Sequence, residues 1–136
     1  MIAPDSSVVI AALAPWHVAH TVAREALAKA DLGLVAHVAY ETTSALSRMP
    51  EGRRIAPDVV LEALGRRFRS EWLALNGPQA RSALTLAVAA GVRGGALYDA
   101  LIAATARQHD ARILSADRRA KPAYEAVGAD IAYLKA

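Results

Sequence analysis

Short apolar segments alternate with longer segments of helical periodicity along this chain of 136 residues. The short segments have the apolar composition of buried strands, and they lie at 1–4, 34–37, 72–75, 111–117 and 130–134. Strands that alternate with helices usually join one sheet through crossover connections, so this order predicts an α/β fold with a mainly parallel sheet. No repeat, low-complexity tract or linker divides the sequence, and we therefore expect a single domain over residues 1–136.

The helical segments carry start and stop signals. In the segment 78–91, Pro78 lies near the first turn and Gly91 follows the last, which is the usual asymmetry of helix ends. A glycine-containing turn then precedes a helix that contains Asp99. We expect the remaining helices at 7–14, 17–30, 40–49, 57–70 and 118–128.

Composition narrows the possible functions. Hydrophobic residues make up 54% of the chain, which excludes a disordered protein. Cysteine is absent, so a metal would have to be held by oxygen or histidine, and the net charge of +3 weakly favours an anionic partner. Because neither a signal peptide nor an apolar run of about 20 residues is present, we expect a soluble cytoplasmic protein without membrane contact.

Four acidic residues occupy positions that an α/β fold brings to one edge of its sheet. Asp5 directly follows the first strand, and Asp117 ends the strand-like segment 111–117. Asp99 lies at the start of a helix, and helices of such folds start at the same edge, where ligands bind. Glu41 lies about one turn into the helix that follows the strand-like segment 34–37, within reach of the same crevice.

Each acid also has a structural explanation. Asp5, Asp99 and Asp117 are suited to capping helix starts, and Glu41 is suited to a solvated helix face. Four carboxylates that converge would repel one another and would be costly to bury without a partner. Their convergence would therefore imply a hard cation such as Mg²⁺ or Mn²⁺, which prefers oxygen ligands.

Each of the four acids lies in a short motif. The motifs are DSSVVIAAL at 5–13, AYETTSAL at 39–46, LYDALIAATA at 97–106 and ILSADRR at 113–119. Together they resemble the PIN domain family, and within it the VapC toxins of VapBC toxin–antitoxin pairs. The resemblance covers essentially the whole chain and implies a three-layer α/β/α fold. It also implies a Mg²⁺-dependent endoribonuclease toxin, in which Mn²⁺ can substitute for Mg²⁺.

The resemblance assigns roles to individual residues. Asp5, Glu41, Asp99 and Asp117 match the acidic metal-binding and catalytic quartet of the family. The implied reaction is cleavage of an RNA phosphodiester bond by a metal-activated water, with one or two ions.

Two hydroxyl residues lie beside these acids. Ser7 near the first acid and Ser115 before the fourth match small polar positions that would orient carboxylates, although a capping or turn role explains them equally well. Arg118 and Arg119 directly follow the fourth acid, so we expect them to contact RNA phosphates. His37, four residues before Glu41, is expected to be buried or to cap a helix rather than to join the acids.

The resemblance also implies partners. A small VapB-like antitoxin would bind and silence the protein, and homodimers would assemble within the toxin–antitoxin complex. We expect the antitoxin to lay an apolar helix in a groove near Trp16, Val18 and Val22, although these residues would equally suit the core.

Two other functions compete with this reading. A metal-dependent phosphatase would also place an acid after the first strand, but the haloacid-dehalogenase type needs a second aspartate where this chain has Ser7. A catalytically silent PIN-like module that binds RNA or protein should have lost acids, and all four are present.

Overall fold

Three parallel strands form the sheet of this protein in a computed structural model that describes residues 1–135. The strands are β1 (Ile2–Pro4), β2 (Arg112–Ser115) and β3 (Ile131–Tyr133), in the order β1-β2-β3. Pro4 pairs with Leu114, and Ser115 pairs with Tyr133. The first and last segments of the chain therefore flank a strand that lies more than a hundred residues from the N-terminus, and the predicted parallel α/β class is confirmed.

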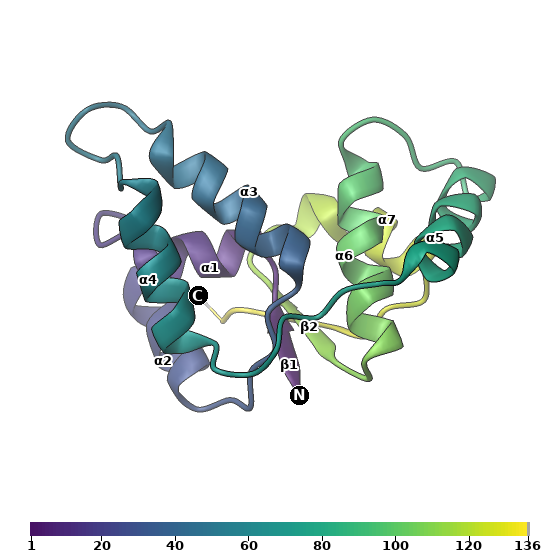
Figure 1. Ribbon diagram of the computed structural model, residues 1–136, viewed down its shortest axis with the longest axis horizontal. Helices are drawn as coiled ribbons and strands as arrows, with labels where there is room; N and C mark the ends of the chain where they lie inside the picture. Colours follow the sequence, from purple (N-terminus) through teal and green to yellow (C-terminus); the bar gives the residue numbers. More distant parts are fainter. Residues whose placement is uncertain (136) are drawn as a thin grey trace.

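Helices cover both faces of this sheet (Figure 1). On one side lie α1 (Ser6–Leu13), α2 (His20–Ala28), α3 (Ala36–Ser47) and α4 (Pro57–Arg67). On the other side lie α5 (Gly77–Ala89), α6 (Ala96–Gln108) and α7 (Lys121–Ala126), the last preceded by a short 3₁₀ turn, η1 (Arg118–Ala120). The three-layer arrangement expected from the resemblance is thus present.

The core is centred on β2, which packs against α1 on one face and α6 on the other. Ile113 of β2, Val8 of α1 and Ile102 of α6 are almost completely buried. Alanine fills much of the remaining interior, including Ala11 and Ala103. Small side chains let the helices approach the sheet closely, which suits the short strands of this fold.

Two of the predicted strands are much shorter than expected. Segments 34–37 and 72–75 are reduced to one isolated parallel bridge, between Val35 and Leu73. The buried side chains of α3 recur at helical spacing from Val38 onward, and the helix itself begins at Ala36, so the chain turns into the helix immediately after Val35. His37 is therefore helical, and Glu41 lies in the second turn of α3.

The helix expected at 17–30 is also shorter than predicted. It begins at His20, because residues 14–20 form consecutive turns in which the His17 amide donates to Ala14 and the His20 amide donates to His17. The imidazole Nδ1 of His17 accepts from the Ala19 amide at 3.0 Å and stabilises this turn. None of the helices among residues 1–135 is long and apolar enough to cross a bilayer.

Candidate active site

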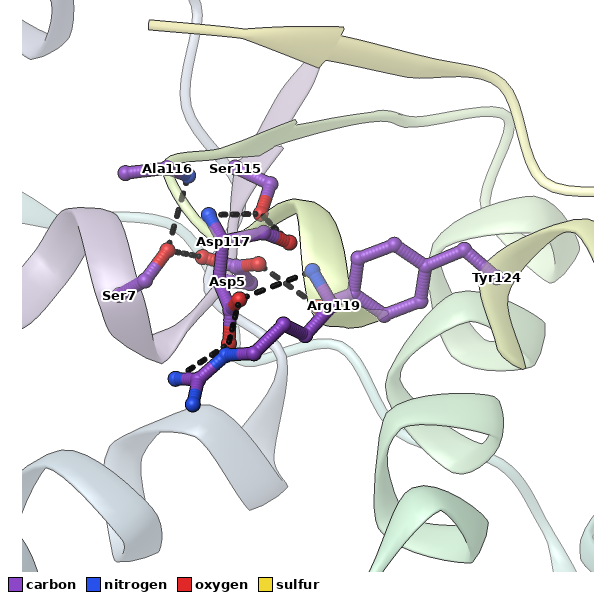
Figure 2. A network of polar contacts seen from close by, with 7 residues as sticks. All are labelled: Asp5, Ser7, Ser115, Ala116, Asp117, Arg119 and Tyr124. Carbon is purple, nitrogen blue, oxygen red and sulfur yellow. Dashed lines mark hydrogen bonds and ion pairs between the residues drawn. The ribbon is translucent and has the colours of Figure 1, made fainter. Parts of the chain in front are cut away.

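Asp5 lies where β1 ends and α1 begins, at the carboxyl edge of the sheet (Figure 2). Its amide donates to the Leu114 carbonyl at 2.9 Å, which continues the pairing of β1 with β2 by one residue. Its carboxylate caps α1 by accepting from the Val8 amide at 3.3 Å, and the residue is 3% exposed. The capping role considered for Asp5 is therefore real, but it uses only part of the carboxylate.

Two hydroxyl groups fix the remaining directions of the Asp5 carboxylate. The Ser7 hydroxyl donates to Oδ1, and the Tyr124 hydroxyl donates to Oδ2 at 2.7 Å. Burial and the nearby Asp5 carboxylate raise the pKa of Tyr124 far above its usual range, so the phenol is a hydrogen-bond donor at neutral pH. The orientation of Asp5 is thus set by contacts from α1 and α7.

Ser7 also links the ends of two strands. Its Oγ accepts a hydrogen bond of 2.9 Å from the amide of Ala116, just after β2. The same hydroxyl therefore connects Asp5, after β1, with the loop that carries Asp117. Such contacts are typical of groups that orient a ligating carboxylate.

Tyr124 was missed in the sequence because its partner is 119 residues away. The one available signal was a tyrosine in a short helix after the fourth acid, since a buried tyrosine hydroxyl usually requires a hydrogen-bond partner.

Asp117 caps the turn η1 and lies beside Asp5 in the same network (Figure 2). Its Oδ1 accepts from the Arg119 amide at 3.0 Å and from Arg119 Nε at 3.1 Å. Partial burial raises the pKa of Asp117, but the hydrogen bonds and charge of Arg119 outweigh it and hold the pKa below its ordinary value. Arg119 is therefore bound to an acid of the site.

Ser115 shapes the backbone of this loop. Its Oγ accepts from the Asp117 amide at 3.0 Å and donates to the Asp117 carbonyl at 3.3 Å. It thus holds the main chain of Asp117 and leaves the carboxylate to Arg119. Of the two alternatives considered for Ser115, the geometry corresponds to the turn role.

Glu41 projects from α3 toward the same region. Its Oε2 is 3.7 Å from His37 Nε2, and its Oε1 is buried without any hydrogen-bond partner. Burial raises the pKa of Glu41 and Asp5 adds to this, although His37 and the Ser6 hydroxyl oppose it. His37 is partly exposed and contacts this acid, so the expectation that it would be buried or would cap a helix is wrong.

Asp99 lies in the first turn of α6, which follows the turn at Gly94. Gly94 has φ +63°, a conformation that glycine adopts without strain and that directs the chain into the helix. The N-cap of α6 is Gly95, and no side chain caps this helix. Asp99 therefore does not act as the cap that a local reading suggests.

The electrostatic environment of Asp99 connects it with the other three acids. Partial burial, followed by the charges of Glu41, Asp5 and Asp117, raises its pKa from 3.8 to about 6. The charges of three acids from separate segments of the chain thus reach Asp99. Among residues 1–135, however, no three acidic or histidine side chains are grouped closely enough, as they stand, to hold a metal ion.

The sequence profile of the PIN domain family matches residues 2–126. The chain belongs to the PIN domain family. Ribonuclease VapC40 of Mycobacterium tuberculosis is 40% identical over 131 residues, which cover 96% of this PIN domain protein and 97% of VapC40. This identity over nearly the full length of both chains places the protein among the VapC ribonuclease toxins.

Solved structures give the same fold for this PIN domain. FitAcB from Neisseria gonorrhoeae matches with a TM-score of 0.70 at 21% identity, over 96% of each chain. VapC20 of Mycobacterium tuberculosis, described as a toxin that cleaves the sarcin-ricin loop, matches with a TM-score of 0.68 at 20% identity, over 95% of this chain and 96% of that one. At these identities the likeness shows the fold alone.

The raised pKa of Asp99 predicts a pH-dependent loss of stability in the PIN domain without metal. A group whose pKa is higher in the folded state stabilises that state below the unfolded pKa and ceases to do so as the pH rises through the folded value. For Asp99 this range runs from about 4 to about 6. We therefore expect the free energy of unfolding in chelator to fall across that interval.

The variant Asp99→Asn should remove this loss. The full difference in pKa would correspond to about 3 kcal/mol, and partial exposure together with the lost helix-dipole interaction reduces the expected gain at pH 7 to about 1 kcal/mol. Urea unfolding of both proteins at pH 4 and pH 7 measures it. A variant that is no more stable than the parent at pH 7 would show that Asp99 carries no electrostatic strain.

Proposed function

We propose that this chain cleaves RNA internally with a divalent cation held by Asp5, Glu41, Asp99 and Asp117. The observation that supports the proposal is that the charges of Glu41, Asp5 and Asp117, from three other segments, all reach Asp99 and raise the cost of ionising it. A cluster that is electrostatically unfavourable by itself is expected where a cation binds. The names of the VapC relatives supply the RNA substrate.

The donor set of this site fits Mg²⁺ or Mn²⁺. All four candidate ligands are carboxylates, and Glu41 Oε1 is a buried oxygen without a partner, as expected of a ligand position. When bound, such a cation polarises the phosphate and lowers the pKa of a bound water. Because the carboxylates are too dispersed as they stand, we infer that binding draws their side chains together.

The protein's own residues prepare the acids for this task. Asp5 is held by Ser7 and Tyr124, so it offers a fixed carboxylate against which the others can adjust. Glu41 and Asp99 are the two acids whose pKa values are raised, and they would gain most from a cation. Ser7 and Ser115 then act as positioning residues, the first on a carboxylate and the second on the backbone of Asp117.

Arg118 and Arg119 follow this site and have partners in the free protein. Arg119 is bound to Asp117, and the Arg118 guanidinium lies 4.2 Å from the centre of the Tyr133 ring. The side chain of Arg119 is 93% exposed, so it can turn toward solvent at little cost. We infer that it leaves Asp117 for an RNA phosphate when a cation neutralises the acids, while Arg118 remains beside it as a second phosphate contact.

Cleavage assays distinguish this function from its rivals. Purified protein should cut a mixture of cellular RNAs in Mg²⁺ or Mn²⁺ and leave it intact in chelator. Release of phosphate from a small ester, without RNA cleavage, would favour the phosphatase. An absence of both activities with metal present would favour a silent binding module.

We further propose that a small VapB-like antitoxin silences the protein through the groove between α1, α2 and α4. This groove has a volume of 430 Å³ and a mixed lining, in which Leu13, Ile55 and Val59 are among the apolar residues. Arg24 and Arg67 also line it, so an amphipathic helix with acidic residues would fit its charge. The residues expected near the antitoxin groove, Trp16, Val18 and Val22, are not among those that line it. Val18 is fully exposed just before α2, and Trp16 donates a hydrogen bond to the Arg53 carbonyl.

A charge placed in this groove should weaken the complex. Val59 is 51% exposed, so Val59→Glu should preserve the fold and still disturb an apolar helix bound there. Copurification with the product of the adjacent small reading frame should be lost in Val59→Glu and kept in Leu84→Glu, an equally exposed site on α5. If both variants still copurify with the antitoxin, the antitoxin binds elsewhere on the protein. The expected homodimer stays a prediction.

A further inference from the structure

Two aromatic rings are stacked between α3 and α6, beside two of the acids. The rings of His37 and Tyr98 have centroids 5.0 Å apart and planes that differ by 7°. His37 contacts Glu41, and Tyr98 directly precedes Asp99. The stacked pair therefore lies at the border of the acidic site rather than in the hydrophobic core.

Tyr98 is exposed although it is a large aromatic residue. It is 54% exposed, and one face of its ring is covered by His37 while the other is not used by that stack. It also lines a hollow of 340 Å³ between α5 and α6, together with Leu97 and Leu101. A half-exposed tyrosine ring that is supported by a second ring is a surface on which a further planar group can stack.

Charge limits what can bind next to this site. Four acids repel the phosphates of RNA, and the two arginines that follow the fourth acid already have partners. A nucleobase is neutral and planar, so it can stack on an aromatic ring even where nearby acids repel the phosphates. Unpaired bases are commonly bound in this way, on tyrosine and histidine rings.

We propose that Tyr98, supported by His37, stacks an unpaired nucleobase of the RNA next to the bond that is cut. The proposal rests on the proposed function and adds to it a substrate-binding residue beside the acids. Tyr98 contacts the substrate, and His37 is a positioning residue that holds the tyrosine ring. Stacking would thereby bring the adjacent phosphate to the acids.

Binding is measured without cleavage, so that it is independent of the nuclease assay. The probe is a short single-stranded RNA that contains the fluorescent base 2-aminopurine, titrated with protein in chelator. Removing an aromatic ring on which a base stacks typically weakens binding by about 5- to 150-fold. We expect Tyr98→Ala to lose affinity by this factor and to quench the fluorescence of the probe less than the parent does. Tyr98→Phe should bind as the parent does.

Two controls separate stacking from other contacts. Leu84→Ala changes an exposed apolar residue of the same hollow and should leave binding unchanged. The ratio of affinities between parent and Tyr98→Ala should also be the same at low and high salt, unlike the effect of losing a phosphate contact. Thermal melting of Tyr98→Ala verifies folding, which is expected because the site is exposed and alanine favours helix.

Three results would overturn the proposal. They are equal binding by Tyr98→Ala and the parent, a loss in Tyr98→Phe as large as in Tyr98→Ala, and a loss that disappears at high salt. If the parent stacks the probe but does not cut RNA with metal, the proposed nuclease function fails while the stacking site stands.

Discussion

Asp99→Asn is expected to lower metal-dependent RNA cleavage by at least about 100-fold, because removing one group that stabilises developing charge typically has an effect of this size. The charges of the other three acids all raise the pKa of Asp99. Its carboxylate does not cap α6. Asparagine keeps the shape of the side chain but removes the charge that would hold a cation. The loss should therefore appear in turnover while the protein remains folded.

Asp110→Asn is the matched control for this experiment. It makes the same chemical change at an exposed aspartate just beyond the other end of α6, roughly 16 Å along the helix. Asp110 has φ +54°, a conformation that asparagine also tolerates. Cleavage of RNA should be normal in this variant, and a normal rate in Asp99→Asn, purified free of host nucleases, would refute the assignment of Asp99.

Mn²⁺ is expected to stabilise the parent protein strongly and Asp99→Asn only slightly. A cation that binds only the folded state adds about 2.7 kcal/mol at a concentration 100 times its dissociation constant. For a domain of this size that corresponds to a rise in melting temperature of about 10 °C. The raised pKa values of Glu41 and Asp99 give the physical reason, since a bound cation offsets the cost of burying their charges and the repulsion from neighbouring acids.

Thermal melts in chelator and in excess Mn²⁺, on the parent, Asp99→Asn and Asp110→Asn, measure this stabilisation. The parent and Asp110→Asn should shift together, and Asp99→Asn should shift much less. Equal shifts in all three proteins would mean that the metal acts elsewhere or binds without selectivity.

The positions of Asp5 and Asp117 were predictable because both depend on strand ends. An apolar strand that ends in an acid places that acid at the carboxyl edge of any parallel sheet, whichever order the strands take. The amide of Asp5 continues the pairing with β2, and Asp117 begins the turn after it. The local pattern therefore predicted that both acids lie at the carboxyl edge of the sheet, but it did not predict their side-chain contacts.

Contacts between distant segments could not be read from local patterns. The hydrogen bond of Tyr124 to Asp5 and the stack of His37 on Tyr98 depend on how helices pack across the sheet. The segment 34–37 misled for another reason, because a short apolar run suits strand and helix equally and the helical spacing of α3 decided the outcome. Arg119 likewise gained a partner in Asp117 that its exposed position did not suggest.

Direct measurement of Mn²⁺ binding tests the central claim that the four acids form one cation site. Electron paramagnetic resonance reports free Mn²⁺, and titrations would compare the parent, Glu41→Gln, Asp99→Asn and Asp110→Asn. Glu41 and Asp99 lie on different helices, so only a shared site makes both variants bind at least 10-fold more weakly while Asp110→Asn binds as the parent does. Parental affinity in both Glu41→Gln and Asp99→Asn would contradict the claim.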